Sequence, residues 1–342
     1  MKRFCVSLAI LAAMCSVAYS AEITARLRGH ALKPGDCIGI LAPSGWLESG
    51  DVDGAIELLR SQGYRVKLAP SVSAVYGYFA GTDRKRAEDI NSFFRDKTVK
   101  AILCARGGYG SARVLDKLDY KMIARNPKPL IGYSDITALH IALGEKAGIS
   151  TIHGPMAATF SGGKPDSDYT RRQLLDGLTR DIPIGNLPMP EGRKLETVII
   201  GKAEGVIMGG NLSVMASLVG TPWELDGTGA LLLIEEVGEK PYRIDRMMNQ
   251  LYQSGLLGRV NGILLGDFVD CESDEPSGPG NFSLDDVLLH YAELSRKPVI
   301  RGVPSGHGGY NAFLPMGVRA RMKANADDTA TLVIDGPALL GD

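Results

Sequence analysis

The sequence has no excess of charge of either sign, because its 342 residues include 38 Lys and Arg and 39 Asp and Glu, for a formal net charge of −1. This balance gives no reason to expect a nucleic acid or an anionic membrane as a partner. No His, Cys or carboxylate grouping has metal-ligand spacing such as His-Glu-x-x-His. We therefore expect neither a metal nor another cofactor.

Long apolar runs are scarce as well, and one of them stands at the N-terminus. This run, Phe4–Val17, follows two cations and ends before Ala18-Tyr19-Ser20, which places small residues at the two positions that a signal peptidase reads. We expect residues 1–20 to be a cleaved export signal, which predicts an exported, periplasmic protein. The stretch is too short, and too soon followed by polar sequence, to predict a stable membrane span after cleavage.

Cysteine is rare, with five residues in the whole chain. Three of them lie beyond the export signal, at Cys37, Cys104 and Cys271. Cys37 and Cys104 fall at or near the ends of apolar, strand-like runs, which favours buried thiols over a disulfide framework.

From residue 36 onward, short apolar segments typical of strands alternate with segments whose apolar residues have helical spacing. The strand-like segments are 37–42, 66–69, 101–104 and 130–133, and the helical ones lie near 55–59, 87–94, 112–118 and 136–143. Repeated βα units predict a parallel sheet with helices on both faces. We expect an α/β, Rossmann-like N-terminal domain over residues 21–180.

The stretch 181–196 lacks clear periodicity and contains Pro183, Pro188 and Pro190, so we predict a linker there. Beyond it, strand-like segments occur at 197–200, 205–208, 231–234, 261–265 and within 318–334. Helical segments occur at 212–218 and from Pro241 to Gly255. This less regular order predicts a smaller, mixed α+β C-terminal domain over residues 197–342, and the chain length is compatible with two domains.

A serine stands where an apolar run meets a helical pattern, in Gly132-Tyr133-Ser134-Asp135-Ile136-Thr137. A hydroxyl at a strand-to-helix turn is lifted out of the sheet, and the free N–H groups of the helix start can hydrogen-bond a developing oxyanion. Glycine would stand at Ile136 in the Gly-x-Ser-x-Gly elbow pattern, and a serine before a helix is also a common N-cap. Taken alone, this segment therefore leaves both a nucleophile and a cap open.

Two further segments supply the residue types that a serine nucleophile needs. The strand-like run 231–234 ends in Glu235-Glu236, and His307 stands among glycines in Ser305–Tyr310. A hydroxyl nucleophile needs a base, and the base needs a third group that fixes its tautomer. Successive strand side chains face opposite sides, so one glutamate at most can face the histidine, and alternation does not say which.

The glycine turn Gly107–Gly110 follows a strand-like segment, as a nucleotide-binding loop would. The Gly-x-Gly-x-x-Gly pattern, however, would require glycine at Arg113, and no Lys-Ser or Lys-Thr pair follows. A turn that brings a backbone N–H to a substrate oxygen fits what is present, and so does a purely structural turn.

Six motifs together make the chain resemble the LD-carboxypeptidase family, the murein tetrapeptide carboxypeptidases. They occur in the order of the family, between about Ile38 and Gly317. The motifs are Arg106–Gly110, Gly132–Leu139, His153–Met156, Gly209–Leu212, Glu235–Arg246 and Gly306–Gly308.

The resemblance implies a metal-independent serine peptidase that removes the terminal D-alanine from peptidoglycan tetrapeptides. By motif, Ser134 corresponds to the nucleophile, Glu235 to the orienting carboxylate and His307 to the base. The backbone N–H groups of Gly108 and Asp135 correspond to the oxyanion hole. Many relatives carry Glu-Asp where this chain has Glu235-Glu236, so the motif points to Glu235, with Glu236 as the fallback.

Several questions stay open at the level of sequence. Arg106 and Arg243 are both candidates to meet the carboxylate of the leaving D-alanine. His140 should point away from Ser134 on the same helix, whereas His153 could line the cleft or be structural. Rival interpretations are a self-immunity hydrolase of a peptide-nucleotide antibiotic and a periplasmic binding protein without catalysis. The oligomeric state, a homodimer included, is not determined.

Overall fold

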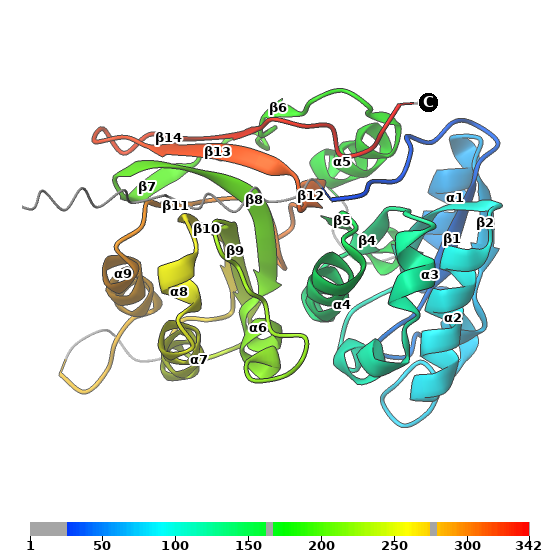
Figure 1. Cartoon of the computed structure of the whole chain (residues 1–342), viewed down its shortest axis with the longest axis horizontal. Coiled ribbons are helices and arrows are strands. Elements are labelled where there is room, and N and C mark those ends of the chain that lie inside the picture. The colour runs from blue at the N-terminus through cyan, green and yellow to red at the C-terminus, as the bar shows by residue number, and fades with distance from the viewer. Residues whose placement is uncertain (1–25, 162–166, 274–278, 342) are drawn as a thin grey trace, which may run out of the picture.

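A computed structural model describes residues 26–161, 167–273 and 279–341 (Figure 1). The expected export signal, residues 1–20, lies outside these ranges. Within them, no helix has both the length and the apolar character needed to span a membrane.

The alternating segments of the N-terminal half build a six-stranded sheet in the order β12-β5-β4-β3-β1-β2. Five of its strands are parallel, and β12 alone runs antiparallel to its neighbour. The strands are β1 (Cys37–Leu41), β2 (Arg65–Leu68), β3 (Val99–Cys104), β4 (Leu130–Gly132), β5 (Thr151–His153) and β12 (Leu314–Met316).

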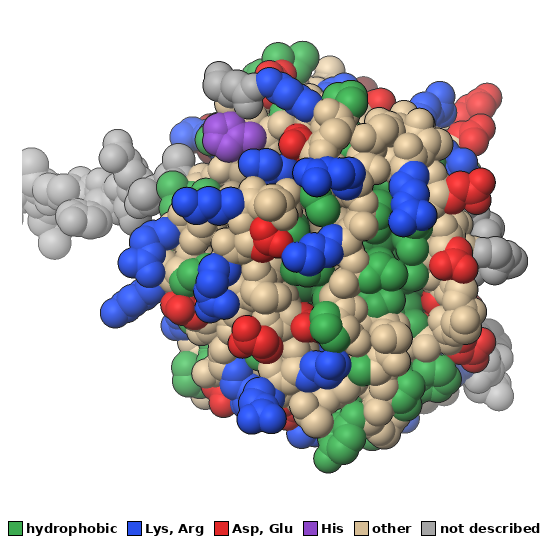
Figure 2. Space-filling view, turned by 90° about the vertical axis from the view of Figure 1, so that its right-hand side faces the viewer, with side chains coloured by type: hydrophobic (Ala, Val, Ile, Leu, Met, Phe, Trp, Pro, Cys, Tyr) green, Lys and Arg blue, Asp and Glu red, His purple; other side chains and the backbone are tan. Residues whose placement is uncertain are grey.

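Helices cover both faces of this sheet because alternate strand side chains point to opposite sides. Ile38 and Ile40 pack on the side of α1 (Asp53–Ser61) and α5 (Asp168–Thr179). Leu41 and Ile102 pack on the other side, with α2 (Asp83–Arg95), α3 (Tyr120–Ala124) and α4 (Thr137–Ala142). The outer face over α1, β2 and α2 carries Lys and Arg side chains with Asp and Glu between them (Figure 2), in keeping with the balanced charge.

Shorter helical turns connect these elements. They are η1 (Pro70–Ser73), η2 (Ser111–Lys117), η3 (Ser134–Ile136), η4 (Leu143–Ala147) and η5 (Ala157–Phe160). The segment expected as a helix over 112–118 is the 3-10 turn η2. The helix expected over 136–143 begins earlier, at Ser134, because η3 runs directly into α4.

The second sheet has eight strands in the order β6-β14-β13-β8-β9-β10-β11-β7, of which β8 to β11 are mutually parallel. Helices α6, α7, α8 and α9 lie along one face of this sheet (Figure 1). The strands are β6 (Gly185–Asn186), β7 (Glu196–Ile199), β8 (Gly201–Asn211), β9 (Leu231–Val237), β10 (Gly262–Val269), β11 (Val299–Arg301), β13 (Arg319–Ala324) and β14 (Ala330–Ile334). The helices are α6 (Leu212–Leu218), α7 (Pro241–Gln253), α8 (Leu256–Arg259) and α9 (Leu284–Ser295).

The expected fold class is confirmed: an α/β chain with a mostly parallel first sheet and a mixed second sheet. Two details differ from the simple division of the chain at residues 181–196. The stretch expected to be a linker contributes β6, which pairs with β14. Strand β12, within the range assigned to the C-terminal domain, pairs with β5 of the first sheet. Strand pairing is non-local, so composition along the chain does not reveal it.

The prediction of buried thiols is confirmed. Cys37, Cys104 and Cys271 are all free and buried. Cys104 ends β3 within the core, and its burial raises the pKa of the thiol far above the ordinary range. The cysteines therefore contribute packing rather than crosslinks.

The two halves meet where β4 and β8 end. The backbone N–H of Asn211 donates to Thr137 Oγ1 at 2.9 Å. A side chain at Gly210 would lie 2.5 Å from that same oxygen, and Gly210 has a φ of +137°, so the position needs glycine. This close contact places the carboxyl end of β8 opposite the turn that follows β4, where ligands of parallel sheets bind. Because Asn211 pairs with Glu235, the end of β9 lies beside it.

Candidate functional site

Ser134 occupies a strained turn between β4 and α4. Its φ is +64°, in the left-handed region that non-glycine residues rarely adopt. Such a conformation costs about 1–3 kcal/mol and persists only where the surroundings impose it. Gly132 makes the turn feasible, because a Cβ there would lie 2.8 Å from Ile136. The turn presents the hydroxyl beyond the end of the sheet, as a nucleophile elbow does.

His307 lies between Ser134 and Glu235. Its Nε2 is 3.1 Å from Ser134 Oγ, and its Nδ1 is 2.8 Å from Glu235 Oε2. Because an ionised carboxylate can only accept, Nδ1–H donates to Glu235, which leaves Nε2 to accept the Ser134 hydroxyl. The imidazole is 19% exposed and the carboxyl of Glu235 is fully buried. In this arrangement an imidazole can take the proton of a hydroxyl while a carboxylate fixes its orientation.

Strand alternation separates the two neighbouring glutamates. Glu235 faces His307, whereas Glu236 faces the start of α6. The Glu236 carboxylate accepts from Asn211 Nδ2 at 2.9 Å and from the Ser213 N–H and hydroxyl at 2.7 and 2.6 Å. Glu236 therefore satisfies the N-terminal groups of α6 and does not contact the imidazole.

Burial is the largest influence on the pKa of the Glu235 carboxylate. It raises the pKa of Glu235, and the hydrogen bond and charge of His307 act in the opposite direction. Tyr133 packs its ring edge-on against the imidazole, with 5.0 Å between ring centroids, and burial raises the pKa of its phenol to about 12. A neutral phenol ring and a buried carboxylate thus both contact the imidazole.

The glycine turn after β3 lies against the serine. A Cβ on Gly107 would be 3.0 Å from Ser134 Cβ and 3.1 Å from Oγ, so a larger residue would displace the hydroxyl. The Gly107 carbonyl accepts from the N–H of Gly45 at 3.1 Å. Because a trans peptide points its N–H opposite to its C=O, the N–H of Gly108 points away from Gly45.

The side chain of Asp135 bonds two neighbouring loops, and its N–H lies at the start of the helical segment. Its Oδ2 accepts from the Ser111 N–H at 2.7 Å and from the Ser44 hydroxyl at 2.6 Å. These bonds tie the loops after β1 and β3 to the turn that carries Ser134. The N–H of Asp135 lies in the first turn of the helical segment, where N–H groups have no partner within the helix.

Two other histidines lie near the site without contacting the serine. His140 Nε2 lies 2.9 Å from the Gly132 carbonyl and Nδ1 lies 2.8 Å from Thr151 Oγ1, as expected of a residue facing away from Ser134. Burial lowers the pKa of His140 to about 4. His153 is also buried, and its Nδ1 lies 3.0 Å from Ser305 Oγ in the loop that carries His307. Both positions indicate structural roles.

The two candidate arginines differ in their surroundings. Arg106 lies against the glycine turn, and its Nη1 donates to the Trp46 carbonyl at 3.2 Å. Arg243 lies at the start of α7 and pairs with Glu239 at 3.2 Å. Of the two, Arg106 is joined to the turn beside the serine.

Sequence reasoning missed several residues that shape the site. Asn211 bonds Glu236 and the start of α6, Asp267 pairs with Arg193, and Asn311 bonds Gly306 in the loop that carries His307. Asn211 stands in the Gly209–Leu212 motif, which was the available signal for it. No group of three or more His, Cys, Asp or Glu suited to a metal ion occurs within residues 26–161, 167–273 and 279–341.

Two family patterns together match most of the described chain. The pattern of the LD-carboxypeptidase N-terminal domain matches residues 38–154, and that of the LD-carboxypeptidase C-terminal domain matches residues 204–322. A probable murein peptide carboxypeptidase of Bacillus subtilis is 38% identical over 88% of this chain and 93% of its own length. A murein tetrapeptide carboxypeptidase of Pseudomonas aeruginosa is 33% identical over 84% of this chain and 93% of its own length.

Solved structures show the same architecture. A muramoyltetrapeptide carboxypeptidase from Oxalobacter formigenes has a TM-score of 0.75 at 30% identity, covering 88% of this chain and 99% of that one. A microcin C7 self-immunity protein has a TM-score of 0.80 at 24% identity, covering 91% of this chain and 99% of that one. The second likeness concerns the fold alone.

Proposed function

The chain belongs to the LD-carboxypeptidase family, and from this premise we propose that it is a serine carboxypeptidase that removes the terminal D-alanine from peptidoglycan tetrapeptides, leaving tripeptides. The observation that carries the proposal is the array of Ser134, His307 and Glu235 at the join of the two sheets. The names of the murein peptide relatives support the substrate class. A binding protein without catalysis would have no use for this array.

In the proposed first step, Ser134 Oγ attacks the carbonyl carbon before D-alanine. An Oγ–C bond forms, and the hydroxyl proton passes to His307 Nε2. Glu235 accepts from Nδ1–H and stabilises the imidazolium while it keeps the ring in place. When the C–N bond breaks, the imidazolium returns the proton to the leaving amine, and D-alanine departs from an acyl-enzyme.

In the second step, water takes the place of the leaving amine. His307 removes a proton from the water as it attacks the acyl carbon, then returns the proton to Ser134 as the tripeptide leaves. The negative oxygen that forms in both steps would accept from the backbone N–H groups of Gly108 and Asp135. The glycine turn at Gly107 and the bonds of the Asp135 side chain support these placements.

The carboxylate of the leaving D-alanine needs a cation, and we assign this role to Arg106. Its place beside the glycine turn supports the assignment, whereas Arg243 is engaged by Glu239. A guanidinium can bind a carboxylate through two parallel N–H donors. Arg106→Ala should therefore raise KM for the tetrapeptide more than it lowers kcat.

We also propose that the protein acts outside the cytoplasm, on the strength of the sequence pattern of residues 1–20. N-terminal sequencing of the protein recovered from a periplasmic fraction should give a chain that begins at Ala21. Full-length protein confined to the cytosol would contradict this part of the proposal.

The proposed activity is tested by incubating the mature protein with murein tetrapeptide and a chelator and following the products by mass spectrometry. The parent and a Ser61→Ala control, altered at the exposed end of α1, should each release one alanine. Ser134→Ala should release none. A tetrapeptide ending in L-alanine should survive, and unchanged D-alanine substrate with the parent protein would refute the proposal.

A further inference from the structure

The loop that carries His307 contains no helix or strand, and Asn311 within it bonds the N–H and the carbonyl of Gly306 at 3.1 and 2.9 Å. It connects β11 to β12 and contains Gly306 and Gly309, both with positive φ. Glycines leave a backbone many accessible conformations, so the position of the imidazole also depends on contacts from outside the loop. Side-chain bonds to Glu235 and Ser134 orient the ring, but they do not fix the backbone on either side of it.

Asp267 fixes the backbone on both sides of His307. Its N–H donates to the carbonyl of Ser305 at 2.9 Å, two residues before the histidine. Its carboxylate lies against Gly308, one residue after the histidine, and the N–H of Gly308 lowers the pKa of Asp267. A side chain at Gly308 would collide with this carboxylate, so glycine is needed for the approach.

A strand irregularity aims Asp267 at the loop. The pairing of β10 with β9 shifts register between Leu265 and Phe268, which places Gly266 and Asp267 in a bulge. Bulges redirect side chains at strand ends. Gly266 has no room for a side chain, because a Cβ there would lie 2.6 Å from the Ser305 carbonyl. The end of β10 therefore packs directly against the start of the histidine loop.

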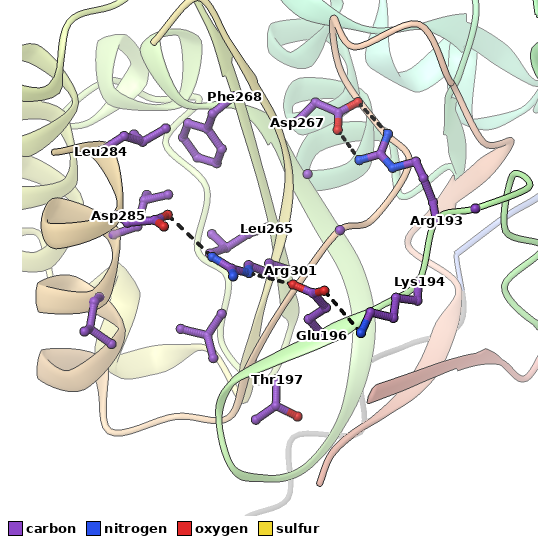
Figure 3. Close-up of a pocket in the computed structure, with 16 residues that line it drawn as sticks. Arg193, Lys194, Glu196, Thr197, Leu265, Asp267, Phe268, Leu284, Asp285 and Arg301 are labelled. Carbon is purple, nitrogen blue, oxygen red and sulfur yellow. Dashed lines mark hydrogen bonds and ion pairs between the residues drawn. The ribbon is translucent and has the colours of Figure 1, made fainter. Parts of the chain in front are cut away.

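Arg193 in turn fixes the carboxylate of Asp267. Its Nη2 lies 2.5 Å from Oδ1 and its Nη1 lies 3.4 Å from Oδ2, a two-point contact visible in Figure 3. The Asp267 side chain is 10% exposed, and burial raises its pKa, whereas Arg193, the Gly308 N–H and the charge of His307 lower it. These partners favour the ionised form of a carboxylate whose burial disfavours it.

Arg193 also reaches the far end of the histidine loop. Its guanidinium lies over the ring of Tyr310, 5.7 Å from the centroid. Tyr310 packs edge-on against Tyr169, whose hydroxyl donates to the Pro188 carbonyl at 2.7 Å. The stretch expected to be a linker thus contacts the loop directly through Arg193 and indirectly through Tyr169, which bonds Pro188.

We propose that Asp267, held by Arg193, is a positioning residue that keeps His307 within reach of Ser134. The inference rests on the proposed function for its kinetic consequence, although the placement of the imidazole is independent of the substrate. Loss of the ion pair lowers the fraction of molecules in which Nε2 meets the hydroxyl. A displacement of about 1 Å can cost a hundredfold in rate. His307 takes part in the chemical step, so the effect falls on kcat and not on KM.

The kinetic test compares Asp267→Ala, Asp267→Asn, Arg193→Ala and Arg193→Lys with the parent on murein tetrapeptide. We expect Asp267→Ala to lower kcat by about 100-fold with KM unchanged. Asp267→Asn and Arg193→Ala should lose less, and Arg193→Lys, which keeps the charge, should stay closest to the parent. Arg321→Ala is the matched control, because Arg321 forms a comparable two-point pair with Asp335 away from the site.

A substrate-free measurement separates this proposal from the proposed function. The downfield proton resonance of His307 Nδ1–H, assigned by its loss in His307→Ala, reports the bond to Glu235. It should broaden or shift in Asp267→Ala and Arg193→Ala and persist in Arg321→Ala. This holds even if the parent cleaves no tetrapeptide, in which case the proposed function alone fails.

Two results would overturn the positioning role. One is an unchanged resonance together with an unchanged kcat in the Asp267 and Arg193 variants. The other is a raised KM at parental kcat, since Asp267 and Arg193 also line a cavity of about 580 Å³, and a direct substrate contact would act there. Should Asp267→Ala not fold, judged by its thermal unfolding, Asp267→Asn and Arg193→Ala decide the question.

Discussion

His307 Nε2 lies 3.1 Å from the hydroxyl oxygen of Ser134, although the two residues come from opposite halves of the molecule. The serine follows β4, and the histidine lies on the loop between β11 and β12. Strand β12 pairs with β5, the neighbour of β4, so the loop ends in the sheet that carries the serine. The crossing of this one strand brings the histidine to the nucleophile.

Replacing Glu235 and Glu236 separately should separate catalysis from stability. Glu235→Gln should lower kcat by about 10⁴-fold, the loss known for the orienting carboxylate in a Ser-His-Asp protease, with little change in the free energy of unfolding. Glu236→Gln should instead lower the free energy of unfolding by about 1–3 kcal/mol, because α6 loses acceptors for its N-terminal groups. Kinetics and urea unfolding of both variants provide the check, and equal kinetic losses would argue against a role specific to Glu235.

Gly107→Ala should impair the reaction without unfolding the protein. The added methyl group would lie 3.0 Å from Ser134 Cβ and would displace the hydroxyl from His307. A loss of about 100-fold in kcat is expected from such a displacement. Gly258→Ala in α8, where a methyl group meets nothing within 4 Å, is the control and should keep parental activity. Parental kcat in Gly107→Ala would show that the turn accommodates the methyl group without displacing the hydroxyl.

Stability should fall as the pH drops from about 6.5 to 4. Burial lowers the pKa of His140 in the folded state to about 4, and it also lowers that of His153. The unfolded chain therefore binds more protons in this interval, so the free energy of unfolding rises with pH there. For His140 alone the full change is on the order of 3 kcal/mol.

Urea unfolding at several pH values measures this dependence. His140→Gln should flatten the slope between pH 4 and 6.5, and His153 should account for part of what remains. His290→Gln removes an exposed imidazole and serves as the control. A slope unaffected by His140→Gln would mean that the buried ring does not contribute to acid sensitivity.

Local patterns sufficed for much of the fold. The periodicity of apolar residues placed β1, β3, β9 and α6 within a residue or a few of their observed bounds, because each is an apolar segment whose pattern reflects burial. Patterns failed where pairing is distant: nothing near Leu314 indicates that it joins the first sheet, and nothing near Gly185 indicates a strand. Short strands owe their existence to a partner edge and not to their own residues.

The residues of the site also include some that local sequence patterns indicated and some that only the structure revealed. Sequence motifs indicated Ser134, Glu235 and His307, and glycine residues indicated the turns around them. The alternation of strand side chains predicts that only one glutamate faces the imidazole. The register of β9 against β8 and β10 decides that it is Glu235. Asp267 and Arg193 carried no sequence signal, because an isolated Asp and an isolated Arg become a pair only when the chain folds.

The sequence by itself determined the kinds of element, their order, the family and the residue types available for chemistry, since these depend on neighbours along the chain. The tertiary structure alone decided which of those residues meet. The distances among Ser134, His307 and Glu235, and the bracing of the histidine loop by Asp267, depend on strand register and on contacts between remote segments. Those contacts arise from packing two sheets together, which no local pattern encodes.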